Sequence, residues 1–110
     1  MIRVFACLAL VLAACAPVAV APPSPLAACE AQGGRLMRVG RLQSEQCVLP
    51  YQDAGKACTD GDQCAGQCIG RETAMSPGQS AVGACQAEHP LFGCFATIEA
   101  GRVAGILCID

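Results

Sequence analysis

The sequence predicts a small disulfide-rich domain with a short N-terminal helix, short antiparallel β-strands and hairpins, and long loops. Eight of its ten cysteines lie between residues 29 and 108, an even number typical of a disulfide framework in an exported chain. Aromatic residues are few and Trp is absent. One core stabilises a domain of this size by about 3 to 5 kcal/mol, whereas each native disulfide contributes on the order of 2 to 4 kcal/mol. We therefore expect four disulfides and no free thiol among Cys29, Cys47, Cys58, Cys64, Cys68, Cys85, Cys94 and Cys108.

The start of the chain has the composition of an export signal. Arg3 supplies a short positive region, and residues 4–14 form an unbroken apolar run. Because a membrane-spanning helix needs roughly 20 apolar residues and Pro17 ends this run early, the sequence disfavours an uncleaved anchor. Simple secretion is the alternative, through an ordinary signal peptidase site formed by Ala13, Ala14 and Ala16.

Leu12-Ala13-Ala14-Cys15 resembles the bacterial lipobox, Leu-Ala-Ala/Gly-Cys, at every position. The resemblance implies that residues 1–14 are a lipoprotein signal peptide, and that Cys15 becomes a lipidated N-terminus. Several acyl chains, at about 0.8 kcal/mol per buried CH₂, hold a protein firmly on a bilayer. Ala16 is not the Asp associated with inner-membrane retention, so the resemblance implies a lipoprotein of the bacterial cell envelope, anchored in the outer membrane and facing the periplasm.

Residues 15–28 are expected to be a tether between the lipidated Cys15 and a disulfide-rich domain at residues 29–110. The segment is rich in Ala and Pro and has no charged side chain. Proline-rich chain favours the extended polyproline II conformation, with a rise of about 3.1 Å per residue.

Capping and turn residues predict the first elements of the domain. Ser24 and Pro25 suit the N-cap and first turn of a helix over residues 26–32, and Gly33-Gly34 ends it. Cys29 then lies in the middle of the helix, where a disulfide would attach it to a neighbour. Residues 35–39 and 46–50 are expected to be strands.

Three segments make up the rest of the domain. Residues 55–70, GKACTDGDQCAGQCIG, predict a compact bridged loop without regular structure. Residues 71–83 predict a long exposed polar loop with a turn at Pro77-Gly78. Residues 92–110 predict a β-hairpin that turns at Ala100-Gly101.

The register of this hairpin bears on disulfide pairing. A two-residue turn sets Cys94 opposite Leu107 and Cys108 opposite Gly93, so that the two cysteines face opposite sides of the hairpin. We therefore expect each to bond to another part of the chain. A three-residue turn would instead set Cys94 directly opposite Cys108.

Charge excludes one class of partner. Without Arg3, six Lys and Arg residues stand against nine Asp and Glu residues, which gives a dispersed net charge of −3. Nucleic acids and anionic surfaces bind to basic patches, which an acidic chain with dispersed charges does not provide, so we expect no nucleic-acid partner.

No catalytic constellation is evident, and we expect neither an enzyme nor a cofactor. The single histidine, His89, is expected to be a solvated loop residue. Residues 78–82, GQSAV, end in Val and therefore miss the G-x-S-x-G motif of a nucleophile elbow. A thioredoxin-like role needs C-x-x-C, which is absent.

A metal site is the more specific alternative to a disulfide framework, with ligands from Cys58, Cys64, Cys68 and His89. Cysteines of exported proteins usually form disulfides with one another, so we expect none of these residues to bind a metal. Asp60-Gly61-Asp62 begins like a calcium loop but continues into Cys64. Thr59 as a cap, with Asp62 at capping-box spacing, explains this stretch locally.

Three motifs carry a resemblance to a known group. They are C-E-A-Q-G-G at residues 29–34, DAGKACTDGDQCAGQC at residues 53–68 and F-G-C-F at residues 92–95. Together with the lipobox they resemble small uncharacterised cysteine-rich lipoproteins of proteobacteria. The resemblance covers nearly the whole domain and implies no activity.

Two functions fit these features. The first is a non-catalytic binding or structural module, held at the membrane through the lipid on Cys15. The alternative is an inhibitor of an envelope or host hydrolase, because a disulfide-stapled loop is already ordered for binding. The loop between Cys68 and Cys85 would then offer Arg71 or Met75 to a protease. The sequence specifies neither a protein partner nor an oligomeric state.

Overall fold

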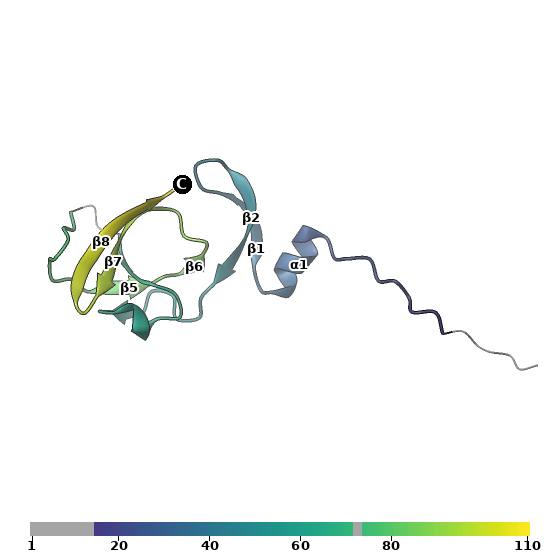
Figure 1. Ribbon diagram of the computed structural model, residues 1–110, viewed down its shortest axis with the longest axis horizontal. Helices are drawn as coiled ribbons and strands as arrows, with labels where there is room; N and C mark the ends of the chain where they lie inside the picture. Colours follow the sequence, from purple (N-terminus) through teal and green to yellow (C-terminus); the bar gives the residue numbers. More distant parts are fainter. Residues whose placement is uncertain (1–14, 72–73) are drawn as a thin grey trace, which may run out of the picture.

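A computed structural model describes residues 15–71 and 74–110, and the expected signal peptide at residues 1–14 lies outside them. One short helix precedes two antiparallel sheets, of strand order β1-β2-β6 and β3-β5-β4-β7-β8 (Figure 1). This arrangement, with four disulfides, confirms the expected fold class. The elements in chain order are α1 (Pro25–Ala31), β1 (Arg35–Val39), β2 (Ser44–Pro50), β3 (Ala57–Cys58), the 3₁₀ turn η1 (Gly61–Gln63), β4 (Cys68–Gly70), β5 (Gly83–Cys85), β6 (Glu88–His89), β7 (Gly93–Glu99) and β8 (Arg102–Ile109).

Helix α1 begins as its capping residues predict. The Ser24 hydroxyl oxygen accepts a hydrogen bond from the Ala27 N–H at 3.2 Å, and Pro25 occupies the first turn, where no N–H is needed. The helix ends before Gly33, whose φ of 79° suits glycine. Residues 15–24 are exposed and have no regular secondary structure, and the last part of the expected tether segment, from Pro25, already belongs to α1.

Strands β1 and β2 form a hairpin that is bonded to the helix. Leu36 pairs with Cys47 and Val39 with Ser44, so β2 begins two residues before the predicted strand. Cys29 in α1 is bonded to Cys47 in β2, which confirms that a disulfide attaches the helix to a neighbour. A Cβ on Gly34 would lie 2.6 Å from the Cys47 Sγ, so the backbone here requires glycine.

The prediction of an irregular loop over residues 55–70 is wrong. This segment contains β3, η1 and β4, and β3 and β4 each pair with β5. Strands of two or three residues show no periodicity in the sequence, because each is defined by a partner strand from another part of the chain. The prediction that the segment is bridged is confirmed, since Cys58 is bonded to Cys68 and Cys64 to Cys85.

Half of the buried residues in the main core of the five-stranded sheet are cysteines. Its buried residues are Cys58, Cys68, Cys85, Ala96, Ile98 and Val103. Met75 and Cys64 pack against this cluster from outside. Small side chains and disulfides fill the centre, so this core buries little apolar surface. The disulfides supply part of the stability that a larger domain would gain from burying more of it.

The β7–β8 hairpin corrects the predicted disulfide pairing. The two-residue turn at Ala100-Gly101 is present, and Ile98 pairs with Val103 as predicted. The next pair is Thr97 with Gly105, so Ala104 is an extra residue in a β-bulge. A bulge shifts the register by one residue, which sets Cys94 directly opposite Cys108. These two cysteines are therefore bonded to each other, with 4.0 Å between their Cα atoms, and not to other parts of the chain.

Candidate binding site

The two sheets meet at residues 86–92, a segment that begins with a buried polar side chain. Gln86 is 3% exposed. Its side-chain oxygen accepts a hydrogen bond from the Gln67 N–H at 3.2 Å, and its side-chain N–H donates to the Glu88 carbonyl at 2.7 Å. The same segment continues into β6, which pairs with β2. Gln86 therefore fixes the position of this segment between the strands of both sheets.

A cavity lies on each side of this segment. The first, of about 400 Å³, lies between it and the β1–β2 hairpin, and we call it the hairpin groove. The second, of about 420 Å³, lies toward Tyr51 and Gly66. Pro90, Leu91 and Phe92 line both cavities. Both volumes fall in the range of small-molecule and peptide side-chain sites.

The hairpin groove combines an apolar lining with cationic side chains. Its apolar residues are Met37, Val39, Val48, Ala87, Pro90, Leu91 and Phe92. Arg38 projects from β1 and Arg71 from the segment after β4. Among the described residues neither guanidinium has a carboxylate partner, whereas Glu88, which also lines the groove, is paired with Arg35 at 2.6 Å.

This chemistry suits a partly apolar ligand with an anionic group. The apolar lining would cover the ligand's hydrocarbon part, and the two guanidinium groups would bind a carboxylate or phosphate. One wall is held by the Cys29–Cys47 disulfide and the other by the Gln86 hydrogen bonds. Both walls are therefore held in place by bonds within the domain.

The sequence did not indicate this site. Arg38 and Arg71 are distant in the chain, and the groove that they share forms only where β2 pairs with β6. Two-residue strands such as β6 have no signal in the sequence, so nothing predicted that these side chains would line one cavity.

The loop between Cys68 and Cys85 has a well-defined base. Cys68 and Cys85 lie opposite each other in the ladder of β4 and β5, but each is bonded to another cysteine. Beyond β4, residues 78–81 run beside the start of β8. The Gly78 N–H donates to the Val103 carbonyl at 2.8 Å, and the Val103 N–H donates to the Gln79 carbonyl at 2.9 Å.

The two residues proposed for a protease pocket differ in position. Arg71 is exposed. Met75 is half-buried and packs against the core cluster, and its sulfur occupies the space beside Gly70. Arg71 is therefore the more accessible of the two, because the Met75 side chain fills a gap beside the core.

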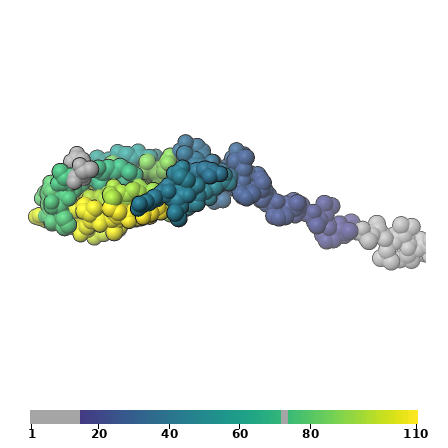
Figure 2. Space-filling model, turned by 90° about the horizontal axis from the view of Figure 1, so that it is seen from above, coloured from purple at the N-terminus to yellow at the C-terminus, as the bar shows by residue number. Residues whose placement is uncertain are grey.

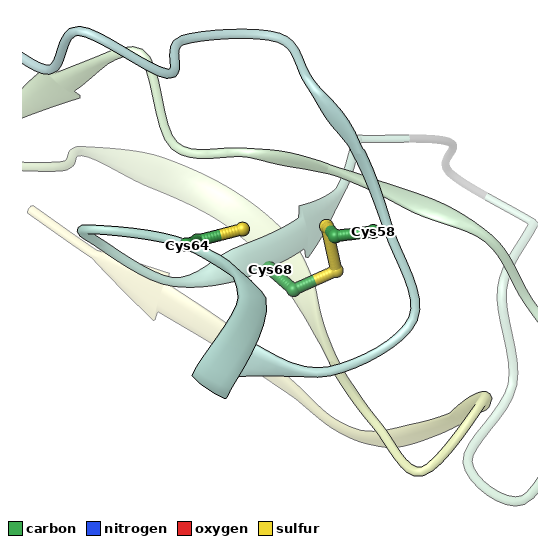
Figure 3. A group of neighbouring side chains, drawn as sticks. All are labelled: Cys58, Cys64 and Cys68. Atoms are coloured by element: carbon green, nitrogen blue, oxygen red, sulfur yellow. A yellow bond between two sulfur atoms is a disulfide. The ribbon is translucent and has the colours of Figure 1, made fainter.

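The three cysteines considered as metal ligands do come together. The sulfur atoms of Cys58, Cys64 and Cys68 all lie within 4.8 Å of one another (Figure 3). Cys58 is bonded to Cys68, and Cys64 to Cys85. A sulfur in a disulfide has no thiolate charge for a metal ion, so the packing of two disulfides explains the cluster. His89 is not part of it.

His89 lies in β6, where it pairs with Leu49, and not in a loop as predicted. Its side chain is nevertheless exposed, which confirms the expected solvation. The pairing was missed because Pro90 follows directly and a proline in a run of residues argues against a strand.

Asp60, and not Thr59 as predicted, caps the 3₁₀ turn η1. Its carboxylate accepts hydrogen bonds from the Asp62 N–H at 3.0 Å, which caps η1, and from the Ala100 N–H at 2.9 Å. These bonds hold the pKa of Asp60 below its usual value. Thr59 is instead paired with Gln63, whose side chain accepts from the Thr59 N–H at 2.8 Å. Asp60 therefore ties the 3₁₀ turn to the β7–β8 turn.

Comparison of the chain with protein-family models, curated proteins and solved structures returned no match. Within residues 15–71 and 74–110, no helix is long and apolar enough to cross a membrane. The four disulfides indicate an oxidising, extracytoplasmic compartment. They also make the domain a rigid module, compatible with a structural or binding role.

Proposed function

We propose that this protein is an exported lipoprotein, anchored through Cys15, which displays a disulfide-stapled binding module at a membrane of the bacterial envelope. The observation that carries the proposal is the contrast between Cys15 and the other cysteines of the described residues. Cys15 is exposed and unpaired, whereas all eight others form disulfides.

The chain around Cys15 supports the anchor. Residues 15–24 are exposed, have no regular secondary structure and lead away from the domain (Figure 1). Lipid on Cys15 would therefore not collide with the fold, and the proline-rich segment would keep the domain clear of the headgroups. Ala16, which is not Asp, favours the outer membrane, as the lipobox resemblance implies.

The hairpin groove is the binding surface of this module. We expect it to bind a partly apolar, anionic ligand through its hydrocarbon lining and the guanidinium groups of Arg38 and Arg71. No group in this assignment acts as an acid, a base or a nucleophile, so the module binds without catalysis.

Intact mass of the membrane-extracted protein tests the anchor. We expect a chain that starts at Cys15 and exceeds its peptide mass by several acyl groups. Cys15→Ser should lose the lipid or keep the precursor, and still form all four disulfides. A mature protein that starts at Ala16 or later and carries no lipid would overturn the proposal.

Decanoate and decanol test the groove, because they share a hydrocarbon chain and differ in charge. We expect decanoate to bind more tightly by isothermal titration calorimetry, and Arg38→Gln and Arg71→Gln each to reduce this preference. Arg41→Gln is the matched control, since Arg41 is exposed and lies outside the groove. Equal binding of the two probes, or no binding, would overturn the assignment of the groove.

Inhibition of a hydrolase is the second candidate, supported by the anchoring of the Cys68 to Cys85 loop. Residues 78–81 are hydrogen-bonded to β8, and Arg71 is exposed near the other end of the loop. If Arg71 occupies a protease pocket, the domain should inhibit trypsin without being cleaved, and Arg71→Ala should remove the inhibition while Arg41→Ala retains it. Cleavage after Arg71 would argue against this candidate.

A further inference from the structure

Strand β8 is an edge strand of the five-stranded sheet, and most of its outer edge is uncovered. Residues 78–81 cover the edge only as far as Val103, through the bonds of Gly78 and Gln79. We call residues 104–110, which follow, the open edge. Figure 2 shows the yellow atoms of this end of the chain uncovered along one side of the domain.

The backbone groups of the open edge can be assigned from the pairing of β7 with β8. Glu99 and Arg102 flank a two-residue turn and therefore form a hydrogen-bonded pair. Alternation along β7 then makes Cys94–Cys108 and Ala96–Ile106 non-hydrogen-bonded pairs. The Cα separation of 4.0 Å between Cys94 and Cys108 agrees, because such pairs are the closer kind.

The N–H and C=O groups of Ile106 and Cys108 therefore face away from β7. No main-chain group of the described residues outside the ladders bonds to them. Such a row of unpaired groups is a template for another strand.

The side chains of the open edge are apolar and unusually exposed. Ile106 is 46% exposed, Leu107 47% and Ile109 42%. Edge strands are commonly protected by Lys, Pro or an inward-facing charge. Residues 104–109 contain none of these, and Asp110 is the first charged residue after Arg102.

From these features we infer that the open edge pairs with the same edge of a second copy of this chain, in an antiparallel two-fold arrangement. Leu107 lies between Ile106 and Cys108, the two residues whose backbone groups face outward, so a two-fold pairing that uses these groups sets Leu107 opposite Leu107 of the second copy. Ile106 then lies opposite Cys108 of the second copy. These are the two residues whose backbone groups face outward, so the register also satisfies their hydrogen bonds.

Side chains and charges agree with this register. Leu107 shares a face with Phe95, and it would pack against its own copy across the two-fold axis. Ile106 would pack against the exposed Cys94–Cys108 disulfide of the second copy. Asp110, whose exposed carboxylate lies 3.9 Å from Arg41 of its own chain, would lie opposite Ala104 and one diagonal step from Arg102 of the second copy, which brings opposite charges together at both ends. Residues 78–81 would stay in place.

Photo-crosslinking in cells tests the pairing with the full chain. We expect p-benzoylphenylalanine at position 107 to give a covalent product of twice the chain mass, with the crosslink joining two β8 peptides. The same residue at position 26 is the control, since Leu26 is 50% exposed and lies on α1. No product, or products only with other proteins, would overturn the inference.

A charge swap tests the register independently of that crosslink. Because Leu107 faces its own copy, Leu107→Lys and Leu107→Glu should each remove most of the dimer in analytical ultracentrifugation, through repulsion of like charges. A mixture of the two variants should dimerise again. Four intact disulfides in each variant exclude misfolding as the cause, and a mixture that stays monomeric contradicts the register.

Discussion

The three-stranded and five-stranded sheets of this protein are assembled from contacts of different range. The first contains the β1–β2 hairpin, which one disulfide, Cys29–Cys47, joins to the neighbouring α1, and it has one long-range pairing, that of β2 with β6. The second brings β4 between β5 and β7, which follow it in the chain only after a long loop, and it has three disulfides.

This difference shows where covalent bonds are needed. Short strands that pair across long loops lose much chain entropy when they come together. Disulfides limit that loss by constraining the unfolded chain. In the five-stranded sheet three of the four strand pairs form across long stretches of chain, against one of the two pairs in the three-stranded sheet, and the five-stranded sheet accordingly contains most of the disulfides.

Removing one disulfide from each sheet should give the largest contrast. We expect Cys58→Ala/Cys68→Ala to lose about 2 to 5 kcal/mol of unfolding free energy, because both sulfur atoms lie in the core cluster. The matched variant, Cys29→Ala/Cys47→Ala, should release α1 and leave amide exchange in β4 and β7 slow. Urea unfolding and hydrogen exchange measure both effects. Equal global losses would mean that the two sheets unfold as one unit.

Deleting Ala104 should remove the β-bulge and keep all four disulfides. Without Ala104, β8 pairs with β7 in a regular register that still sets Cys94 opposite Cys108. Deleting both Ala104 and Gly105 should instead set Cys108 opposite Phe95, on the other face from Cys94, so both thiols should react with an alkylating agent in the unreduced protein. The loss of this bridge should cost about 3 kcal/mol. Loss of the Cys94–Cys108 bond in the single deletion would contradict this account of the register.

Gly34→Ala tests how closely the three-stranded unit is packed. A Cβ at this position would lie 2.6 Å from the Cys47 Sγ and 2.9 Å from the Cys29 Sγ. We expect a loss of about 1 to 3 kcal/mol, typical of overpacking. Gly61→Ala is the control, since nothing lies within 4 Å of its Cβ, and it should be neutral or slightly stabilising. Thermal unfolding compares the two, and equal midpoints would contradict the tight packing.

The smallest expected effect is the pH dependence from Asp60. Because hydrogen bonds lower the pKa of Asp60 in the folded protein, its ionised form stabilises the fold above the ordinary value of 3.8. That contribution should disappear as the pH falls through the lower folded pKa. Asp60→Asn should therefore unfold at a lower temperature than wild type near neutral pH and differ less at acidic pH. A difference that does not change with pH would contradict this role.

Features that depend on neighbouring residues were predicted better from the sequence than features that depend on residues far apart in the chain. The ends of α1 followed from Ser24 and Gly33, and β1 was predicted at its observed bounds, because caps and alternation are local signals. The two-residue turn at Ala100-Gly101 was also predicted correctly. Ala104 was not recognised as a bulge, although Gly105 beside it is a local signal, because a glycine inside a strand often marks a bulge.

The candidate site could not be predicted from the sequence. Its two guanidinium groups reach one groove only after β6 pairs with β2, and a strand of two residues ending at Pro90 gave no signal. Cys15 was the exception, because its motif is complete within four neighbouring residues. The lipidation that this motif predicts remains a prediction until the mature mass is measured.

The order of the cysteines along the chain affects how the protein matures during export. Cys29 and Cys94 each bond to the next cysteine in the sequence, but the pairs Cys58–Cys68 and Cys64–Cys85 are interleaved. Oxidation of thiols in the order in which they emerge from a translocon would join Cys58 to Cys64. Correcting that bond requires thiol–disulfide exchange, which takes seconds to hours without help. We therefore expect the yield of mature protein to depend on a disulfide isomerase, and mispaired intermediates to accumulate in cells that lack one.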